Sequence, residues 1–227
     1  LLGEAPTSGA GAVTIVLDCA PPRALLIDGV EEVIDVAAAP FFQLPAAVRS
    51  PTGALIRGAV LRHERLVLEL DAQVLAELQP GATSCWKPEL RQPAEAGAPP
   101  ARALVFEIGE GRLAGAPLPL VTGVVRVERL CRVPKAPLGH LGMLHHERSL
   151  VSVYDLSRIA DGPATSGEFA VAMEVGGAAV AVAARKVVGV LEGFGAAELS
   201  AGGISYELRD GRAVFFPELE MWLPTAG

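Results

Sequence analysis

Short apolar runs separated by glycine and proline turns recur along the whole chain. Alternating or β-branched runs predict strands at Ala12–Leu17, Ala103–Ile108, Phe169–Val175 and Ala178–Ala183. The last two strands flank Gly176-Gly177, a pair that is typical of a tight hairpin turn. Because long amphipathic helical patterns are lacking, we expect an all-β protein with only short helical turns.

Turn residues divide the rest of the second half of the chain into further strands. Gly109–Arg112 predicts a hairpin turn, and the strand region that follows, Leu113–Val127, is interrupted by two prolines. Ile204–Phe216 predicts a last hairpin around Asp210-Gly211, which is a strong turn dipeptide. A short terminal helix is expected at Pro217–Leu223, with proline in its first turn.

One pattern is used three times. It combines a charged segment, an apolar strand and an acidic residue, and it occurs at Ile56–Leu75, at His140–Ile159 and, more weakly, at Ile204–Leu219. In the first two copies the letters RHER and HHER precede the strand, and Asp71 and Asp155 follow it. We predict that both aspartates cap the helical turn after the strand. The repetition predicts a small barrel-sized unit that is reused along the chain.

Composition restricts both the core and the partners. Hydrophobic residues make up 51% of the chain but aromatic residues only 5%, so the core must consist mainly of Ala, Val and Leu. The net charge of −7 argues against a nucleic-acid partner, since no basic face can replace counterions. The longest strongly apolar run, residues 176–184, is shorter than the roughly 20 residues of a spanning helix, so we predict no membrane insertion.

Cysteine usage and the N-terminus bear on the compartment. The three cysteines are far apart and odd in number, and we expect free thiols in a reducing cytoplasm. The first residues lack the basic segment and apolar core of a signal peptide. We therefore predict a cytoplasmic protein, and since the chain begins at Leu1 we expect it to be part of a longer one.

A histidine-rich segment offers an alternative, a metal-dependent hydrolase that would use His140, His145, His146 and Glu147. Zinc needs three or four ligands that converge on one point. Adjacent residues of a strand face opposite sides, so His145 and His146 are poorly placed for one ion. A solvated charged crest is therefore the favoured interpretation, with no metal at this segment.

A glycine pattern, Gly109–Gly115, has the spacing GxGxxxG after a predicted strand. Pro117 and Pro119 exclude the helix that would bind a dinucleotide pyrophosphate, so a hairpin turn is favoured. We predict no catalytic residue and no cofactor.

Several motifs together resemble the CheW-like domain family. Gly142–Leu156 (GMLHHERSLVSVYDL) resembles the family stretch G-hydrophobic-x-N-L-R-G-x-x-x-P-V-hydrophobic-D-L. Phe169–Leu191 is similar to the start of the second half of such a domain, although the Asp of its V-x-V-D-x-V motif is absent. Residues 25–33 (LLIDGVEEV) fit that motif better. The resemblance implies pairs of SH3-like five-stranded barrels and a non-enzymatic adaptor that couples chemoreceptors to the histidine kinase CheA.

The resemblance also implies a domain organisation. Ala101–Ile159 looks like a first half and Phe169–Leu223 like a second half, which gives one complete CheW-like domain of two barrels at 101–227. Ala12–Leu78 looks like a second half alone, so we expect one barrel at 1–80 and a Pro-rich linker at 81–100. The simplest account is a protein with two tandem domains, cut within the first.

The resemblance implies contact residues as well. The family's Asn-Leu-Arg-Gly crest falls on residues 145–148, so the position of its receptor-contacting Arg is Glu147, and the usual acidic residue of a V-x-E motif is Gly123. The implied partners are the regulatory domain of a CheA-type kinase and the cytoplasmic tip of a chemoreceptor. A diverged structural module without kinase coupling is the alternative. The predicted protein-binding residues are Val121, Gly123, Met143, His146, Glu147 and Arg148, with Arg62 and Glu64 as weaker candidates in the first copy.

Overall fold

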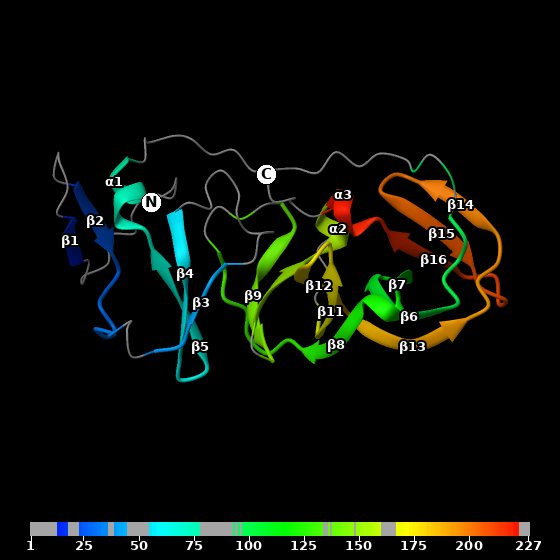
Figure 1. The fold of residues 1–227 in the computed structure, drawn as a ribbon, viewed down its shortest axis with the longest axis horizontal. Coiled ribbons are helices and arrows are strands. Elements are labelled where there is room, and N and C mark those ends of the chain that lie inside the picture. Colours follow the sequence, from blue (N-terminus) through cyan, green and yellow to red (C-terminus); the bar gives the residue numbers. More distant parts are fainter. Residues whose placement is uncertain are drawn as a thin grey trace. The chain divides into compact units, whose positions relative to one another are not determined.

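The computed structural model describes residues 13–17, 23–35, 39–44, 55–77, 93, 95, 97–133, 136, 138–147, 149–159 and 167–222. The chain divides into two compact units: unit 1 comprises residues 1–44 and 51–84, and unit 2 comprises residues 45–50 and 85–227. Strands dominate the described part of both units, and the helices there have three to six residues (Figure 1). The predicted all-β class with short helical turns is confirmed.

Unit 1 contains two small antiparallel sheets in its described part. Strand β1 (Val13–Leu17) pairs with β2 (Arg23–Ile27), so the strand predicted at Ala12–Leu17 is confirmed. The second sheet has the order β3-β4-β5 and leads into a short helix. Its elements are β3 (Phe41–Phe42), β4 (Ile56–Arg62), β5 (Arg65–Leu70) and α1 (Ala72–Glu77).

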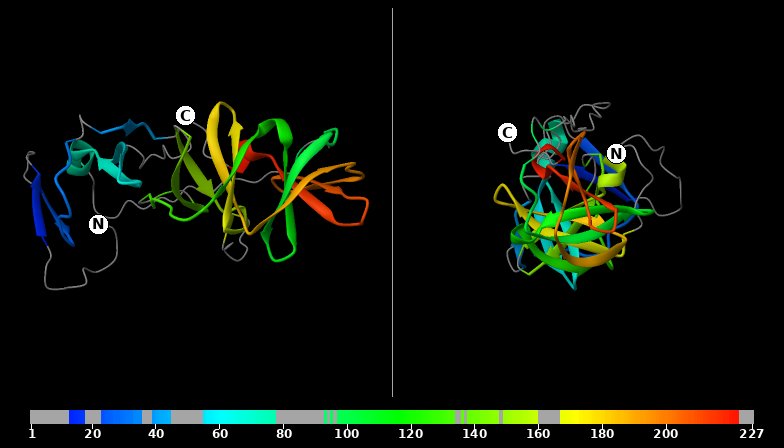
Figure 2. Two further views of the ribbon diagram at one scale, coloured as in Figure 1. Left: turned by 90° about the horizontal axis from the view of Figure 1, so that it is seen from below. Right: turned by 90° about the vertical axis from the view of Figure 1, so that its right-hand side faces the viewer.

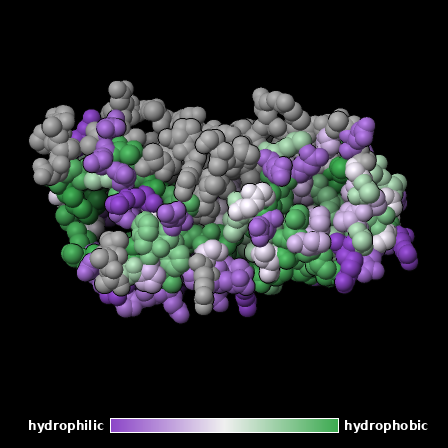
Figure 3. Space-filling view, viewed as in Figure 1, coloured by the Kyte–Doolittle hydropathy of each residue, from purple (hydrophilic) through white to green (hydrophobic). Residues whose placement is uncertain are grey.

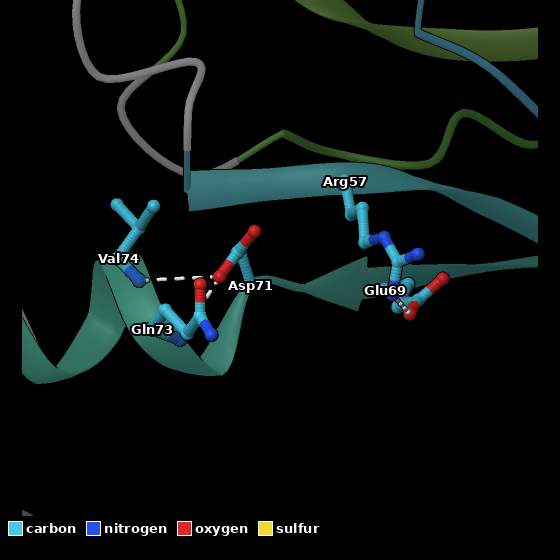
Figure 4. Close-up of polar contacts among 5 residues, drawn as sticks. All are labelled: Arg57, Glu69, Asp71, Gln73 and Val74. Carbon is cyan, nitrogen blue, oxygen red and sulfur yellow. Dashed lines mark hydrogen bonds and ion pairs between the residues drawn. The ribbon is translucent and has the colours of Figure 1, made fainter. Parts of the chain in front are cut away.

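The helix α1 begins directly after Asp71. The carboxylate Oδ1 of Asp71 accepts hydrogen bonds from the backbone N–H groups of Gln73 at 2.9 Å and Val74 at 3.2 Å (Figure 4). These N–H groups lie in the first turn, where no helical carbonyl can reach them. The predicted capping role of Asp71 is confirmed. On the preceding strands, Arg57 and Glu69 form an exposed ion pair at 3.2 Å.

Unit 2 contains a five-stranded and a six-stranded sheet (Figures 1 and 2). The two sheets are consistent with the predicted pair of SH3-like units, but the second has six strands instead of five, and the strand pairings of the described residues do not close either sheet into a barrel. The five-stranded order is β8 (Val121–Arg126), β11 (Phe169–Val175), β12 (Ala178–Ala184), β10 (Ser149–Tyr154) and β9 (His140–His146). The six-stranded order is β13 (Lys186–Glu192), β6 (Arg102–Gly109), β7 (Arg112–Pro117), β16 (Ala213–Pro217), β15 (Gly203–Glu207) and β14 (Ala197–Ser200). The short helices are η4 (Leu118–Leu120), α2 (Leu156–Ile159) and α3 (Leu219–Trp222).

Each sheet of unit 2 combines early and late parts of the chain. In the six-stranded sheet β6 pairs antiparallel with β13, and β7 runs parallel to β16 with Leu113 opposite Val214. In the five-stranded sheet β10 runs parallel to β12, and β8 pairs antiparallel with β11. Neither sheet is therefore built from one continuous segment.

The side chains of unit 2 form three apolar clusters. Because alternate residues of a strand face opposite sides, each central strand contributes to two of them. On β11, Ala170 and Ala172 join a cluster of small side chains on the five-stranded sheet, whereas Val171 and Met173 join a large shared cluster. That shared cluster also contains residues of the six-stranded sheet, such as Phe106. The third cluster, on the other face of the six-stranded sheet, contains Phe194, Tyr206 and Phe216, whose rings contact one another edge-on.

The repeated sequence pattern corresponds to a hairpin followed by a helical turn. It forms β4–β5–α1 in unit 1, and β9–β10–α2 and β15–β16–α3 in unit 2. In the second copy Asp155 is fully buried, and its Oδ1 accepts the backbone N–H groups of Ser157 at 3.0 Å and Arg158 at 3.4 Å. The predicted capping role of Asp155 is thus confirmed.

The two caps differ in burial, which leads to a prediction. Asp155→Ala is expected to destabilise unit 2 by about 2–3 kcal/mol, because it leaves buried N–H groups without an acceptor. Asp71→Ala in unit 1 is expected to cost only about 0.5–1 kcal/mol, because water can replace the partly exposed carboxylate. Hydrogen exchange of the β10 and β5 amides in the full chain measures both effects. Equal costs at the two positions would contradict this account.

Candidate partner-binding surface

The charged crest is a tight hairpin turn. In unit 2 residues 147 and 148 connect β9 to β10, with His146 opposite Ser149. Glu147 has a φ of 56°, in the left-handed region that two-residue hairpin turns require. Glu147 therefore lies at the tip of the turn and not on a strand, and its side chain is exposed. Arg148 lies outside the described residues.

The corresponding turn of unit 1 has the same shape. His63 and Glu64 have φ values of 46° and 61°, and Arg62 lies opposite Arg65. The guanidinium of Arg62 donates a hydrogen bond to Glu32 at 2.7 Å, which lowers the pKa of the Glu32 carboxyl below its ordinary value. Arg62 is thus already engaged within unit 1, and Glu64 occupies the tip of its turn.

Gly123 and His146 lie against each other. They belong to β8 and β9, which are the first and last strands in the order of the five-stranded sheet. A Cβ atom on Gly123 would lie 3.2 Å from the Nε2 atom of His146, closer than comfortable van der Waals contact. The lack of a side chain at position 123 therefore lets the imidazole cover β8, so that the two terminal strands of the sheet meet. Two of the predicted site residues are thus brought together.

Met143 and Val121 are placed differently. Met143 has an exposed fraction of 0%, and its backbone exchanges two 2.8 Å hydrogen bonds with Cys131. Its side chain is therefore part of the core and offers no surface to a partner. Val121 is half-buried at the start of β8 and packs against the shared apolar cluster.

His140 is a core residue. Its ring packs edge-on against Tyr154, with the ring centroids 5.1 Å apart, and both ring nitrogens lack a hydrogen-bond partner among the described residues. Burial lowers the pKa of the imidazole from 6.5 to about 4 and raises the pKa of the Tyr154 hydroxyl. The ring is therefore neutral at pH 7. Within the described part of the chain no three His, Cys, Asp or Glu side chains are grouped as metal ligands would be.

Apolar side chains are exposed on the edge strands of both sheets of unit 2. Strands β8 and β13 each have one sheet neighbour, and their residues alternate between half-buried and exposed. The exposed large apolar residues are Val124 on β8, at 44%, Val188 and Val190 on β13, and Leu120, which ends η4 just before β8. None of the four is among the predicted site residues. The sequence of β13 does not alternate between apolar and polar residues, so no signal in the sequence indicated Val188 and Val190.

A polar hollow lies beside the β6–β7 turn. Arg185 approaches Glu107 at 3.8 Å and Glu110 at 4.0 Å. Such exposed, loosely spaced ion pairs contribute little free energy. The hollow is lined by Glu107, Glu110, Gly111, Glu168, Phe169, Arg185 and Lys186. The turn between the antiparallel strands β6 and β7 confirms that the glycine pattern at 109–115 belongs to a hairpin.

The family model of the CheW-like domain matches residues 102–194. This part of the chain is thus similar to a CheW-like domain. The match begins with β6 and ends just after β13, so it includes the whole five-stranded sheet and three strands of the six-stranded one. The position of the CheW-like domain agrees with the sequence motifs at 142–156 and 169–191.

Comparison with solved structures found similar chains. The scaffolding protein TtCheW from Thermoanaerobacter tengcongensis is 16% identical over 56% of this chain and 100% of that chain, with a TM-score of 0.46. Among curated proteins the search found no match. In the part of the chain that the structure describes, no helix is long and apolar enough to cross a membrane.

Proposed function

We propose that this protein is a non-enzymatic adaptor that holds a chemoreceptor and a CheA-type histidine kinase together. The observation that carries the proposal is the CheW-like domain at residues 102–194, which belongs to a family of coupling proteins. The exposed apolar side chains on β8 and β13 also support it, because such residues on a sheet edge offer surface for burial against another protein.

The contact surface is proposed to include the crest and the two edge strands. Glu147 presents its exposed carboxylate at the tip of the β9–β10 turn, and His146 lies next to it against Gly123. Arg148 stays in the proposed surface as the residue that follows Glu147 in the sequence. Val121 contributes through its half-buried position on β8, whereas Met143 supports the surface from inside the core.

The proposed domain organisation follows the repeats. Residues 101–227 form a complete CheW-like domain of two barrels, 81–100 a linker, and 1–80 the second half of a preceding domain. The order of hairpin and helical turn in β4–β5–α1, which matches β15–β16–α3, supports this assignment. A coupling protein of this kind works in the cytoplasm, beside the receptor tip and the kinase.

Binding to the kinase tests the proposal directly. The full chain is expected to bind the regulatory domain of a CheA-type kinase in a pull-down and in titration calorimetry. Val124→Glu and Val188→Glu are each expected to weaken partner binding at least tenfold, because a charge would be desolvated in an apolar contact. Val16→Glu, an equivalent change at an exposed valine of unit 1, is the matched control.

The outcomes separate the candidate functions. Absence of binding by the intact chain, where an ordinary coupling protein binds, would reject the adaptor proposal and favour a structural module without kinase coupling. Binding that is equally weakened by Val16→Glu would show that the effect is not specific to the edge strands.

A further inference from the structure

We propose that His146 is a pH-sensitive latch, which holds β8 against β9 when its imidazole is neutral and opens when the imidazole is protonated. In the closed position the ring lies over Gly123 and joins the two terminal strands of the five-stranded sheet. In the open position the outer edge of β8 is left free. The latch is a property of the free chain, and only its consequence for a partner rests on the proposed function.

His146 and Gly123 lie on the face of the sheet that carries the cluster of small side chains. His146 is two residues from Leu144, a member of that cluster, and alternate residues of a strand share a face. Gly123 lies opposite Ala172, another member. Because a Cβ atom at position 123 would lie 3.2 Å from the Nε2 atom of His146, the ring fills the space that a side chain there would need. The latch therefore closes the sheet over apolar side chains.

The closed position suits a neutral ring and disfavours a charged one. The Nε2 atom of His146 is buried and has no hydrogen-bond partner among the described residues, although the side chain as a whole is 24% exposed. A protonated imidazole has an N–H donor on both nitrogens. In the closed position one of these donors would be buried without an acceptor, and burying a charge in this way is costly. Protonation therefore drives the ring toward water.

Glu147 supplies a partner for the protonated ring. Its carboxylate Oε1 is 4.0 Å from the Nε2 atom of His146, and its side chain is 78% exposed at the tip of the turn. Within the described part of the chain it is the carboxylate at ion-pair distance from this ring. The other charged or titratable residues on the surrounding elements are His140 and His145 on β9, Tyr154 on β10, Glu174 on β11, Arg126, Glu128 and Arg129 in and just after β8, and Arg148, which lies outside the described residues. A ring that turns from Gly123 toward Glu147 exchanges a buried site for an ion pair in water.

Opening of the latch changes what β8 offers to another protein. In the described part of the chain β8 has one sheet neighbour, β11, and Figure 3 shows hydrophobic residues at the surface over β8 and β13. Once the ring has left Gly123, the backbone groups on the outer edge of β8 are free to pair with a strand of a partner. Binding of the kinase regulatory domain is therefore expected to be at least threefold tighter at pH 5.5 than at pH 8.

Hydrogen exchange of the full chain without a partner tests the latch. The amides of residues 122–125 are followed at pH 5.5 and pH 8, with rates corrected for the intrinsic effect of pH, and the central strand β12 reports any global opening. The expected result is at least fivefold lower protection of β8 at pH 5.5, with β12 changing less. His146→Phe keeps a ring of similar size that does not titrate, so its β8 protection is expected to be equal at both pH values. His146→Ala removes the ring and is expected to give low β8 protection at both.

Each other outcome overturns the proposal. Equal β8 protection at the two pH values in the unchanged chain would show that no latch opens in acid. A loss of protection that persists in His146→Phe would assign the effect to another group, such as His140, which this variant retains. Full protection in His146→Ala at pH 8 would show that the ring does not close the sheet. Kinase binding is measured separately: binding that is independent of pH, beside the expected exchange, would remove the link between the latch and the partner and leave the adaptor proposal standing.

Discussion

Trp222→Ala is expected to lower the free energy of unfolding of unit 2 by about 3–5 kcal/mol, the cost of removing a large buried aromatic side chain. Trp222 is 2% exposed and belongs to the apolar cluster that the two sheets share. Its ring packs edge-on against Phe215 at 5.8 Å, and its indole N–H donates a hydrogen bond to the carbonyl of Gly202. The substitution removes these contacts and leaves a cavity between the sheets.

The measurement is urea unfolding of the full chain followed by circular dichroism, with hydrogen exchange of the unit 2 strands. Met221→Ala is the matched control, because Met221 is the preceding residue of α3 and is only partly buried. A loss below about 1 kcal/mol for Trp222→Ala would contradict the assignment of α3 to the core.

Acidification from pH 7 to pH 4.5 is expected to destabilise unit 2 by about 2–3 kcal/mol through His140 alone. Burial lowers the pKa of His140 from 6.5 in the unfolded chain to about 4 in the fold. Between these two values the unfolded chain binds the proton and the folded chain does not. The stability that the neutral His140 contributes is therefore fully present above pH 6.5, and it is lost as the pH falls toward 4.

His140→Leu tests this effect, because leucine fills much of the same apolar space and does not titrate. Unfolding free energies of both proteins between pH 7 and 4.5 are compared in a Trp86→Phe background, in which Trp222 is the one remaining tryptophan. Between pH 7 and 4.5, the protein with His140→Leu is expected to lose about 2–3 kcal/mol less unfolding free energy than the protein with His140. An identical pH dependence in the two proteins would be inconsistent with a buried neutral His140.

Local features of the fold were predictable from the sequence because they depend on neighbouring residues. The turn at Gly176-Gly177 and the caps at Asp71 and Asp155 follow from backbone conformation and from one side-chain acceptor. The all-β class followed from apolar runs and turn residues in the same way. The family motifs then indicated the CheW-like domain at residues 102–194.

The placement of the site residues depends on distant strands and could not be predicted in the same way. Gly123 and His146 belong to β8 and β9, the two terminal strands of one sheet, and their contact depends on how the whole sheet is arranged. Met143 lies in a seven-residue strand whose central positions are buried, a fact that its local pattern does not reveal. Val124 and Val188 are contact candidates because they are exposed on β8 and β13, which are edge strands of their sheets. The sequence alone does not show which strands lie at the edges.

The interleaving of early and late strands has a consequence for synthesis of the protein. Strand β7 pairs with β16, about 100 residues later in the chain, and such distant pairing slows folding. Until β16 has been synthesised, β7 lacks its parallel neighbour and leaves one edge unpaired. Chaperone demand of the nascent chain should therefore peak between the emergence of β7 and that of β16.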